Sequence, residues 1–142
     1  MKRLSTLIAA TACALLVLSA VPAGAAGAGK FDLLGPRGIA HCDGSGIFSG
    51  APGGFGFAVI NAPANATVAT TVSIKGQQPN TTYNIRLIQG QADCFTFDAT
   101  VTTNGQGNGT VRVSEPSVSS TAFVAVDPTT GGPNFVTATY NH

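Results

Sequence analysis

Short runs of alternating apolar and polar residues occupy the chain from residue 55 to its end. A period of two places successive side chains on opposite faces of a β-strand. Clusters of Gly, Pro, Asn and Asp separate the runs, and such clusters form turns. The pattern therefore predicts strands over residues 55–61, 68–74, 81–89, 95–101, 110–113, 122–126 and 135–140.

The run over residues 81–89 shows its two faces most clearly. Tyr83, Ile85 and Leu87 share one face, and we expect them to point into the core. Arg86 belongs to the opposite face, which the alternation predicts to be exposed.

In the next run, over residues 95–101, Phe95 and Phe97 alternate with polar residues and are predicted to point inward. Asp98 then lies on the outward face. If the two strands are neighbours, Asp98 is within reach of Arg86 for a cross-strand ion pair. An exposed pair of this kind would add little stability.

Two turns follow from the residue types. The sequence Asn-Gly-Gln-Gly-Asn-Gly at 104–109 tolerates positive φ and predicts a hairpin that joins residues 95–101 to 110–113. The last two predicted strands are joined across residues 127–134.

Helix is nearly absent from these predictions, since no segment carries apolar residues at helical spacing without interruption by Gly, Pro or β-branched residues. The segment at 44–56 is too rich in glycine for a helix and allows at most an edge or bulged strand. Many short strands separated by turns predict an all-β fold, an antiparallel β-sandwich of about seven strands, because each half-buried sheet needs a second sheet over its apolar face.

The first residues have the three parts of a secretory signal peptide. Two basic residues precede an apolar stretch at 7–21, and the small residues Ala23-Gly24-Ala25 suit a signal peptidase. Cleavage after Ala25 is our first expectation, and cleavage after Ala28 the second. No later stretch approaches the roughly 20 apolar residues of a membrane-spanning helix, so we expect a secreted protein without a membrane span after cleavage.

The chain is thereby divided into three parts: a signal peptide at 1–25, a glycine-rich N-terminal segment at 26–54 and a β-sandwich core at 55–142. Cleavage would leave two cysteines, Cys42 and Cys94, and an even number in an exported chain predicts one disulfide. Closing a loop of this length is worth about 4 kcal/mol on the chain-entropy estimate.

Cleavage also changes the charge, because five basic residues then face six acidic ones. A net charge near −1 without a basic cluster argues against nucleic acid as a partner, since such binding depends on Lys and Arg that neutralise phosphates.

From about residue 70 the chain reads TVSIKGQQPNTTYNIRLIQ, then a Cys, FDATVTTNGQGNGTVRV, AFVAVD and GGPNFVTATYN. In strand order and turn chemistry it resembles the small secreted immunoglobulin-like domains of actinobacteria, of which the neocarzinostatin family of chromophore carriers is the best known. The resemblance implies an immunoglobulin-like sandwich. The chain departs from that family in having one long-range cysteine pair in place of two local pairs, so the ligand is not carried over.

No catalytic constellation emerges from the sequence. His41 and Asp43 flank Cys42 and form at most one pair, which His142 at the end of the chain would join only if the last strand ended nearby. The Asp43-Gly44-Ser45-Gly46 segment lacks the first glycine, the parallel strand and the helix of a nucleophile elbow. We predict no metal site and no cofactor.

The sequence therefore predicts a secreted, non-catalytic β-sandwich protein that binds a protein or small-molecule partner or acts at the cell surface. An alternative is a carrier of a small apolar ligand or chromophore, with Phe48, Phe55 and Phe57 as possible lining residues. A hydrolase built around His41 and Asp43 is a more distant alternative.

Overall fold

The computed structural model describes residues 27–37, 52–63, 67–90, 94–131 and 134–142. These residues form nine β-strands and no α-helix. The strands are β1 (Gly29–Arg37), β2 (Pro52–Asn61), β3 (Thr67–Ile74), β4 (Thr82–Ile88), β5 (Ala99–Thr102), β6 (Gly109–Pro116), β7 (Thr121–Pro128), β8 (Asn134–Val136) and β9 (Tyr140–Asn141).

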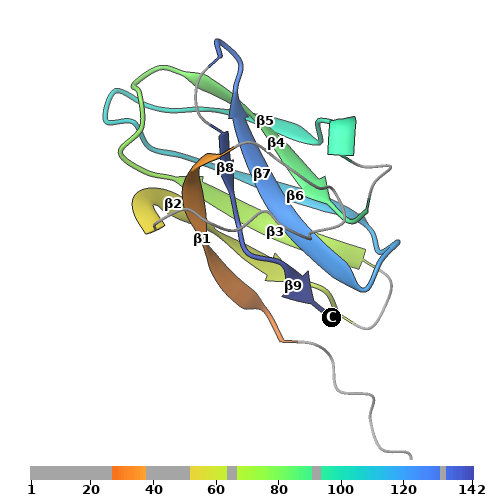
Figure 1. The fold of residues 1–142 in the computed structure, drawn as a ribbon. Coiled ribbons are helices and arrows are strands. Elements are labelled where there is room, and N and C mark those ends of the chain that lie inside the picture. Colours follow the sequence, from red (N-terminus) through yellow and green to blue (C-terminus); the bar gives the residue numbers. More distant parts are fainter. Residues whose placement is uncertain (1–26, 38–51, 64–66, 91–93, 132–133) are drawn as a thin grey trace, which may run out of the picture.

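All strand pairs are antiparallel, and the strands follow one another around the sheet in the order β5-β4-β7-β8-β1-β2-β3-β6, with β9 paired to β7. This single sheet curls into a nearly closed barrel (Figure 1). Its two edge strands, β5 and β6, lie close to each other. We call the line along which these edges face each other the seam.

Strand β1 joins the two halves of the barrel. Its first part pairs with β2, and after a register shift between Asp32 and Leu34 it also pairs with β8. The Tyr140 hydroxyl donates a hydrogen bond to the carbonyl of Gly27 at 2.6 Å, and its ring meets the Phe31 ring edge-on at 5.7 Å. These contacts fix the start of β1 in a segment that the sequence shows only as glycine-rich.

The core follows the predicted alternation. Strand β3 alternates half-buried and buried side chains along its whole length, and Tyr83, Ile85 and Leu87 are buried as predicted. Each fully buried Ile, Leu or Val contributes about 1.5–3 kcal/mol relative to its exposed state. The largest fully buried side chains of this core are Leu33, Ile60, Ile74, Ile85, Leu87, Val68, Val72, Val124 and Val126.

The hairpin predicted between residues 95–101 and 110–113 is wrong. Within 104–109 the chain does reverse, since the Asn104 amide donates to the Asn108 carbonyl at 2.8 Å and the Gly107 amide donates to the Asn104 carbonyl at 2.9 Å. However, β5 pairs with β4, and β6 pairs with β3. Turn residues determine only the local reversal, whereas each strand pairs where it buries its apolar face.

The predicted strand at 95–101 is also wrong in its first half. It begins at Ala99, and Phe95 and Phe97 are 85% and 58% exposed instead of buried. The Asp98 carboxylate accepts a hydrogen bond from the Leu87 amide at 2.6 Å and takes the place of a strand partner there. The chain therefore leaves the sheet before Asp98, although its sequence continues to alternate.

The predicted pairing of residues 122–126 with 135–140 is confirmed, with one interruption. Strand β7 pairs with β8 and then with β9 in a register shifted by one residue. At the shift, two hydrogen bonds join Thr137 to Val124. The Thr137 amide donates to the Val124 carbonyl, and the Val124 amide donates to the Thr137 hydroxyl, each at 3.0 Å. The threonine hydroxyl thus accepts a hydrogen bond that a backbone carbonyl accepts in a regular ladder.

Candidate functional site

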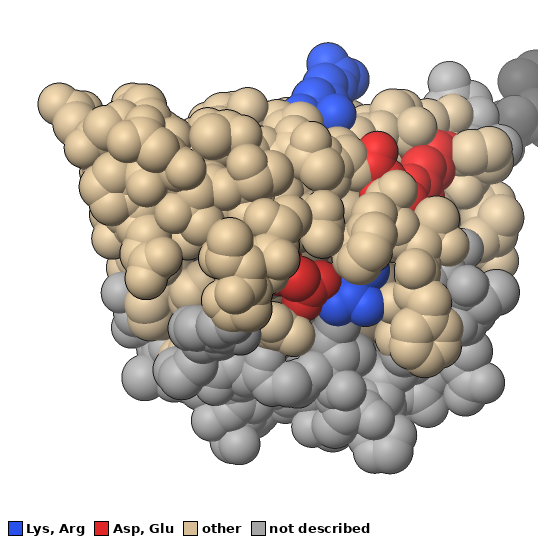
Figure 2. All heavy atoms as spheres, turned by 90° about the horizontal axis from the view of Figure 1, so that it is seen from above, with Lys and Arg blue, Asp and Glu red and all other residues tan. Residues whose placement is uncertain are grey.

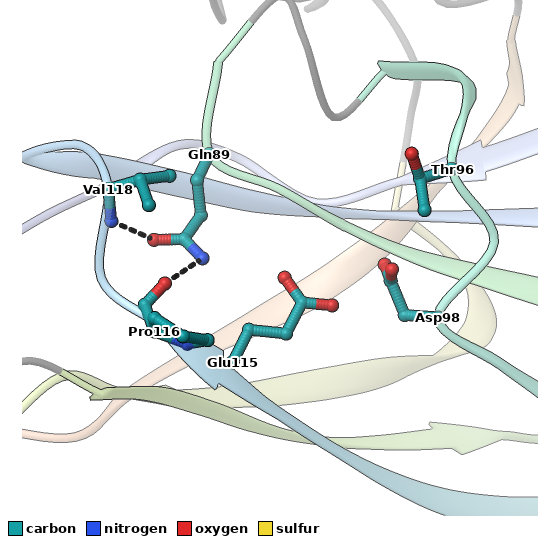
Figure 3. A pocket seen from close by; sticks show the side chains of 6 residues that line it. All are labelled: Gln89, Thr96, Asp98, Glu115, Pro116 and Val118. Atoms are coloured by element: carbon teal, nitrogen blue, oxygen red, sulfur yellow. Dashed lines mark hydrogen bonds between the residues drawn. The ribbon is translucent and has the colours of Figure 1, made fainter.

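The two edges of the seam separate because their strands differ in length. Strand β5 begins only at Ala99, whereas β6 continues to Pro116. Where β5 is missing, the seam opens into a hollow of about 250 Å³, which we call the seam hollow (Figure 3). Its lining residues are Gln89, Thr96, Asp98, Glu115, Pro116 and Val118.

Gln89 holds one wall of the seam hollow in place. The Gln89 amide nitrogen donates to the Pro116 carbonyl at 3.0 Å, and the Gln89 amide oxygen accepts from the Val118 amide at 3.1 Å. The Gln89 side-chain amide thus makes one donor and one acceptor bond to the backbone of this segment, like the peptide groups of a neighbouring strand. Because Gln89 is only 3% exposed, its amide needs these two partners, and together the bonds fix this wall of the hollow.

Two carboxylates point into the seam hollow from opposite sides, Glu115 from β6 and Asp98 from the residue just before β5 (Figure 3). One oxygen of Asp98 is already engaged by the Leu87 amide. Charged side chains are sparse on the face drawn in Figure 2, and the acidic ones gather at two places. Two carboxylates among its lining residues give the hollow an acidic character, which suits a cationic group.

Of the exposed apolar side chains, Val118 lines the hollow and is 70% exposed. Phe95 and Phe97 are also exposed, and in the sequence they are the neighbours of the lining residue Thr96. These three are the large hydrophobic side chains that stand exposed in the described part of the chain. Apolar groups gathered beside a hollow are typical of a binding surface.

Arg86 forms a different ion pair from the predicted one. It bonds Asp127 of β7, with 2.5 Å between the guanidinium nitrogen and the carboxylate oxygen, and it also donates to the Cys94 carbonyl. The Arg86 and Asp127 side chains are only 11% and 14% exposed. The expectation of an exposed Arg86–Asp98 pair is therefore wrong.

The outer face of β4 is covered, and this explains the error. A second apolar cluster lies on that face, composed of Ile88, Phe123, Ala125 and Val136. Burial raises the pKa of Asp127, and the opposing attraction of Arg86 is the smaller effect. The pair is thus a structural feature with a desolvation cost. Arg86 also contacts the segment before β5, through the Cys94 carbonyl and through the Phe97 ring, which lies 5.8 Å from the guanidinium.

The phenylalanines proposed as ligand-lining residues lie in two different environments. Phe55 packs against Phe135, with 4.6 Å between ring centroids. Phe57 lies beneath the ammonium groups of Lys30 and Lys75, which are 4.3 and 5.3 Å from its ring centroid. Neither ring lines the seam hollow.

Several predicted residues lie outside the described part of the chain. These are the signal peptide at 1–25, His41, Cys42, Asp43, Ser45 and Phe48. Cys94, the second predicted disulfide cysteine, is 2% exposed. The His142 ring stacks on Tyr140 at 5.5 Å, and its amide donates to the Ser120 carbonyl at 2.9 Å.

Neither a metal-binding cluster nor a membrane-crossing helix is present among the described residues. They contain no group of three His, Cys, Asp or Glu side chains placed to hold a metal ion. Within the same ranges there is no helix with the length and apolar character needed to cross a membrane.

Comparison with known proteins gives no family. No protein-family model matches the chain, and no curated protein matches it.

Proposed function

We propose that the chain is a secreted, non-catalytic binding protein that takes a partner at the seam hollow. The single observation that carries this proposal is a hollow lined by two carboxylates and the exposed Val118, next to a segment in which Phe95 and Phe97 are exposed on either side of the lining residue Thr96. The partner that fits is a segment with a basic side chain next to apolar groups. The signal-like residues 1–25 support export, so such a partner would be met outside the cytoplasm.

The immunoglobulin-like sandwich is part of this proposal. In that fold, strands B and E pair in one sheet, while C, F and G pair in the other. The pairings β3–β6, β4–β7 and β7–β8 correspond to B–E, C–F and F–G when β3 is taken as strand B. Strand β1 would then be the link that joins the two sheets along one side.

A disulfide between Cys42 and Cys94 is the covalent part of the proposal. The burial of Cys94 supports it, since a buried, shielded disulfide resists reduction. We expect the intact mass of the secreted protein to lie about two mass units below the reduced value, and reduction to lower the free energy of unfolding by about 4 kcal/mol. Alkylation of the secreted protein without prior reduction should leave its mass unchanged, and the gain of two alkyl groups would show two free thiols and contradict the pairing.

A selection of short random peptides displayed on phage tests the seam hollow. We expect enrichment of peptides with Lys or Arg beside aromatic or aliphatic residues. Calorimetry with one enriched peptide should show an affinity at least about tenfold lower for Glu115→Gln and for Phe97→Ser. Ser114→Ala, on the same strand but with the side chain on the other face, should bind the peptide as the wild type does.

Two results would contradict the proposed site. One is a peptide whose affinity is the same in Glu115→Gln, Phe97→Ser and wild type. The other is a chromophore that co-purifies with the secreted protein and shows as an extra absorbance band, since this would favour the carrier alternative.

A further inference from the structure

A second candidate surface lies on the outside of the other half of the barrel, where β1, β2, β3 and β6 are adjacent. The registers align Lys30 with Val59, Val59 with Thr71, and Thr71 with Arg112. These four residues form one row across four strands on the outer face. Neighbouring strands are about 4.8 Å apart, so the Cα atoms of Lys30 and Arg112 are separated by about 14 Å.

Next to this row, on the side of Arg112, Val59 and Thr71, the face is hollowed where the side chains are small. The depression has a volume of about 230 Å³, and Ala28, Val59, Asn61, Ala69, Thr71 and Arg112 are among its lining residues. Asn61 and Thr71 offer an amide and a hydroxyl to a ligand in it. The surface thus combines a shallow floor, polar groups and a cation at each end of the row.

A third cation lies beside the row. Lys75 shares the Phe57 ring with Lys30, so one aromatic ring positions two ammonium groups on this side of the sheet. Lys30, Lys75 and Arg112 are all exposed, and the carboxylate that faces out among them is Asp32, opposite Phe57 in the register. The ammonium groups repel each other, and an anion between them would relieve that repulsion.

We propose that this face binds an anionic polysaccharide that lies across the strands from Lys30 to Arg112. The negative groups of the sugar chain would contact the three cations, and its hydroxyl groups would contact Asn61 and Thr71. A lipid surface fits less well, since the aromatic ring of this face, Phe57, lies half-buried beneath Lys30. This site is separate from the seam hollow and does not depend on the function proposed for it.

Calorimetry with three probes tests the proposal: hexagalacturonate as the anionic sugar, maltohexaose as the neutral one and tripolyphosphate as a non-sugar anion. We expect binding of hexagalacturonate alone, weaker in about 300 mM NaCl than in about 50 mM because salt screens exposed charges. Lys30→Gln/Arg112→Gln should lower its affinity at least about tenfold. The matched control, Thr100→Glu/Gln106→Glu, lowers the net charge by the same two units at exposed positions on and next to β5 and should bind as the wild type does.

Four results would overturn the proposal. An affinity unchanged in the Lys30/Arg112 variant would exclude this face, and equal loss in the control would show an effect of net charge alone. Equal binding of maltohexaose or of tripolyphosphate would exclude an anionic sugar as the specific ligand. Salt-dependent self-association that sedimentation detects in the wild type and that Lys30→Gln/Arg112→Gln abolishes would assign the face to a second copy of the chain.

Discussion

Replacing Arg86 with Leu should lower the free energy of unfolding at neutral pH by about 3–5 kcal/mol, as measured by urea unfolding followed by circular dichroism. The substitution would leave the Asp127 carboxylate nearly buried, at 14% exposure, without its counter-charge. It would also remove the donor to the Cys94 carbonyl. An uncompensated buried charge is among the few causes of so large an effect from one substitution.

The pH dependence of this loss follows from the pKa of Asp127. Burial raises that pKa above its ordinary value of 3.8, so the folded state binds the proton more tightly than the unfolded chain. The resulting stabilisation is fully present below the unfolded pKa and is lost as the pH rises through the raised folded pKa. Without Arg86 the pKa of Asp127 should rise further. The deficit of Arg86→Leu should therefore be largest at neutral pH and shrink as the pH falls toward about 4.

The double variant Arg86→Leu/Asp127→Leu separates the cost of an unpaired charge from the net value of the ion pair. In the described part of the chain, Arg86 Nε and Asp127 Oδ1 have no hydrogen-bond partner, so the pair does not recover its full desolvation cost. We expect the double variant to regain most of the stability that Arg86→Leu loses. A double variant as unstable as the single one would mean that Arg86 acts through packing and its bond to Cys94 instead of through Asp127.

Local alternation predicted strands well where only one face of the sheet is buried and the sequence is not rich in glycine. Strand β3 shows this best, because each of its inward residues is buried and each outward residue is partly exposed. The inward set Tyr83, Ile85 and Leu87 was equally predictable. A period of two reveals which residues point inward, because one face of such a strand packs on the core and the other meets water.

Alternation fails where a strand is buried on both faces. Along β4 the last four residues are all buried. The rule that placed Ile85 inward therefore placed Arg86 correctly on the opposite face but wrongly predicted that this face is exposed. What covers the outer face of a sheet depends on segments distant in the sequence, and the period of a single strand contains no sign of them. The choice of Asp127 over Asp98 as the partner of Arg86 likewise depends on the β4–β7 pairing.

The seam hollow was predictable only in part. Gln89 continues the inward set of residues 83–87, and a polar residue in an inward series requires a hydrogen-bond partner. That signal could have identified Gln89 as structurally important. Its partners, Pro116 and Val118, are 27 and 29 residues away, and only the closure of the barrel brings them together.

The other large effect is expected at Gly56, whose substitution by Ala should lower the free energy of unfolding by about 3 kcal/mol or more. Gly56 has a φ of 132°, which side chains rarely adopt, and an added Cβ would lie 2.0 Å from the Ser73 carbonyl oxygen. That oxygen belongs to β3, so the backbone of β2 approaches its neighbour too closely for any side chain. Relief would require β2 and β3 to separate where Gly56 pairs with Ile74.

Two other glycines isolate the causes. Gly54 has a positive φ of 69° but open space around it, so Gly54→Ala should cost only about 1 kcal/mol of backbone strain. Gly105 has open space and no positive φ, so Gly105→Ala should change stability by less than about 1 kcal/mol. If close approach to β3 is the dominant cause, urea unfolding must show Gly56→Ala to be much less stable than the other two variants. Equal losses of stability at Gly54 and Gly56 would assign the effect to φ alone.

The same substitution should affect the cationic face. Phe57 follows Gly56 directly, and its ring lies beneath the ammonium groups of Lys30 and Lys75. Separation of β2 from β3 should therefore also weaken the binding of hexagalacturonate.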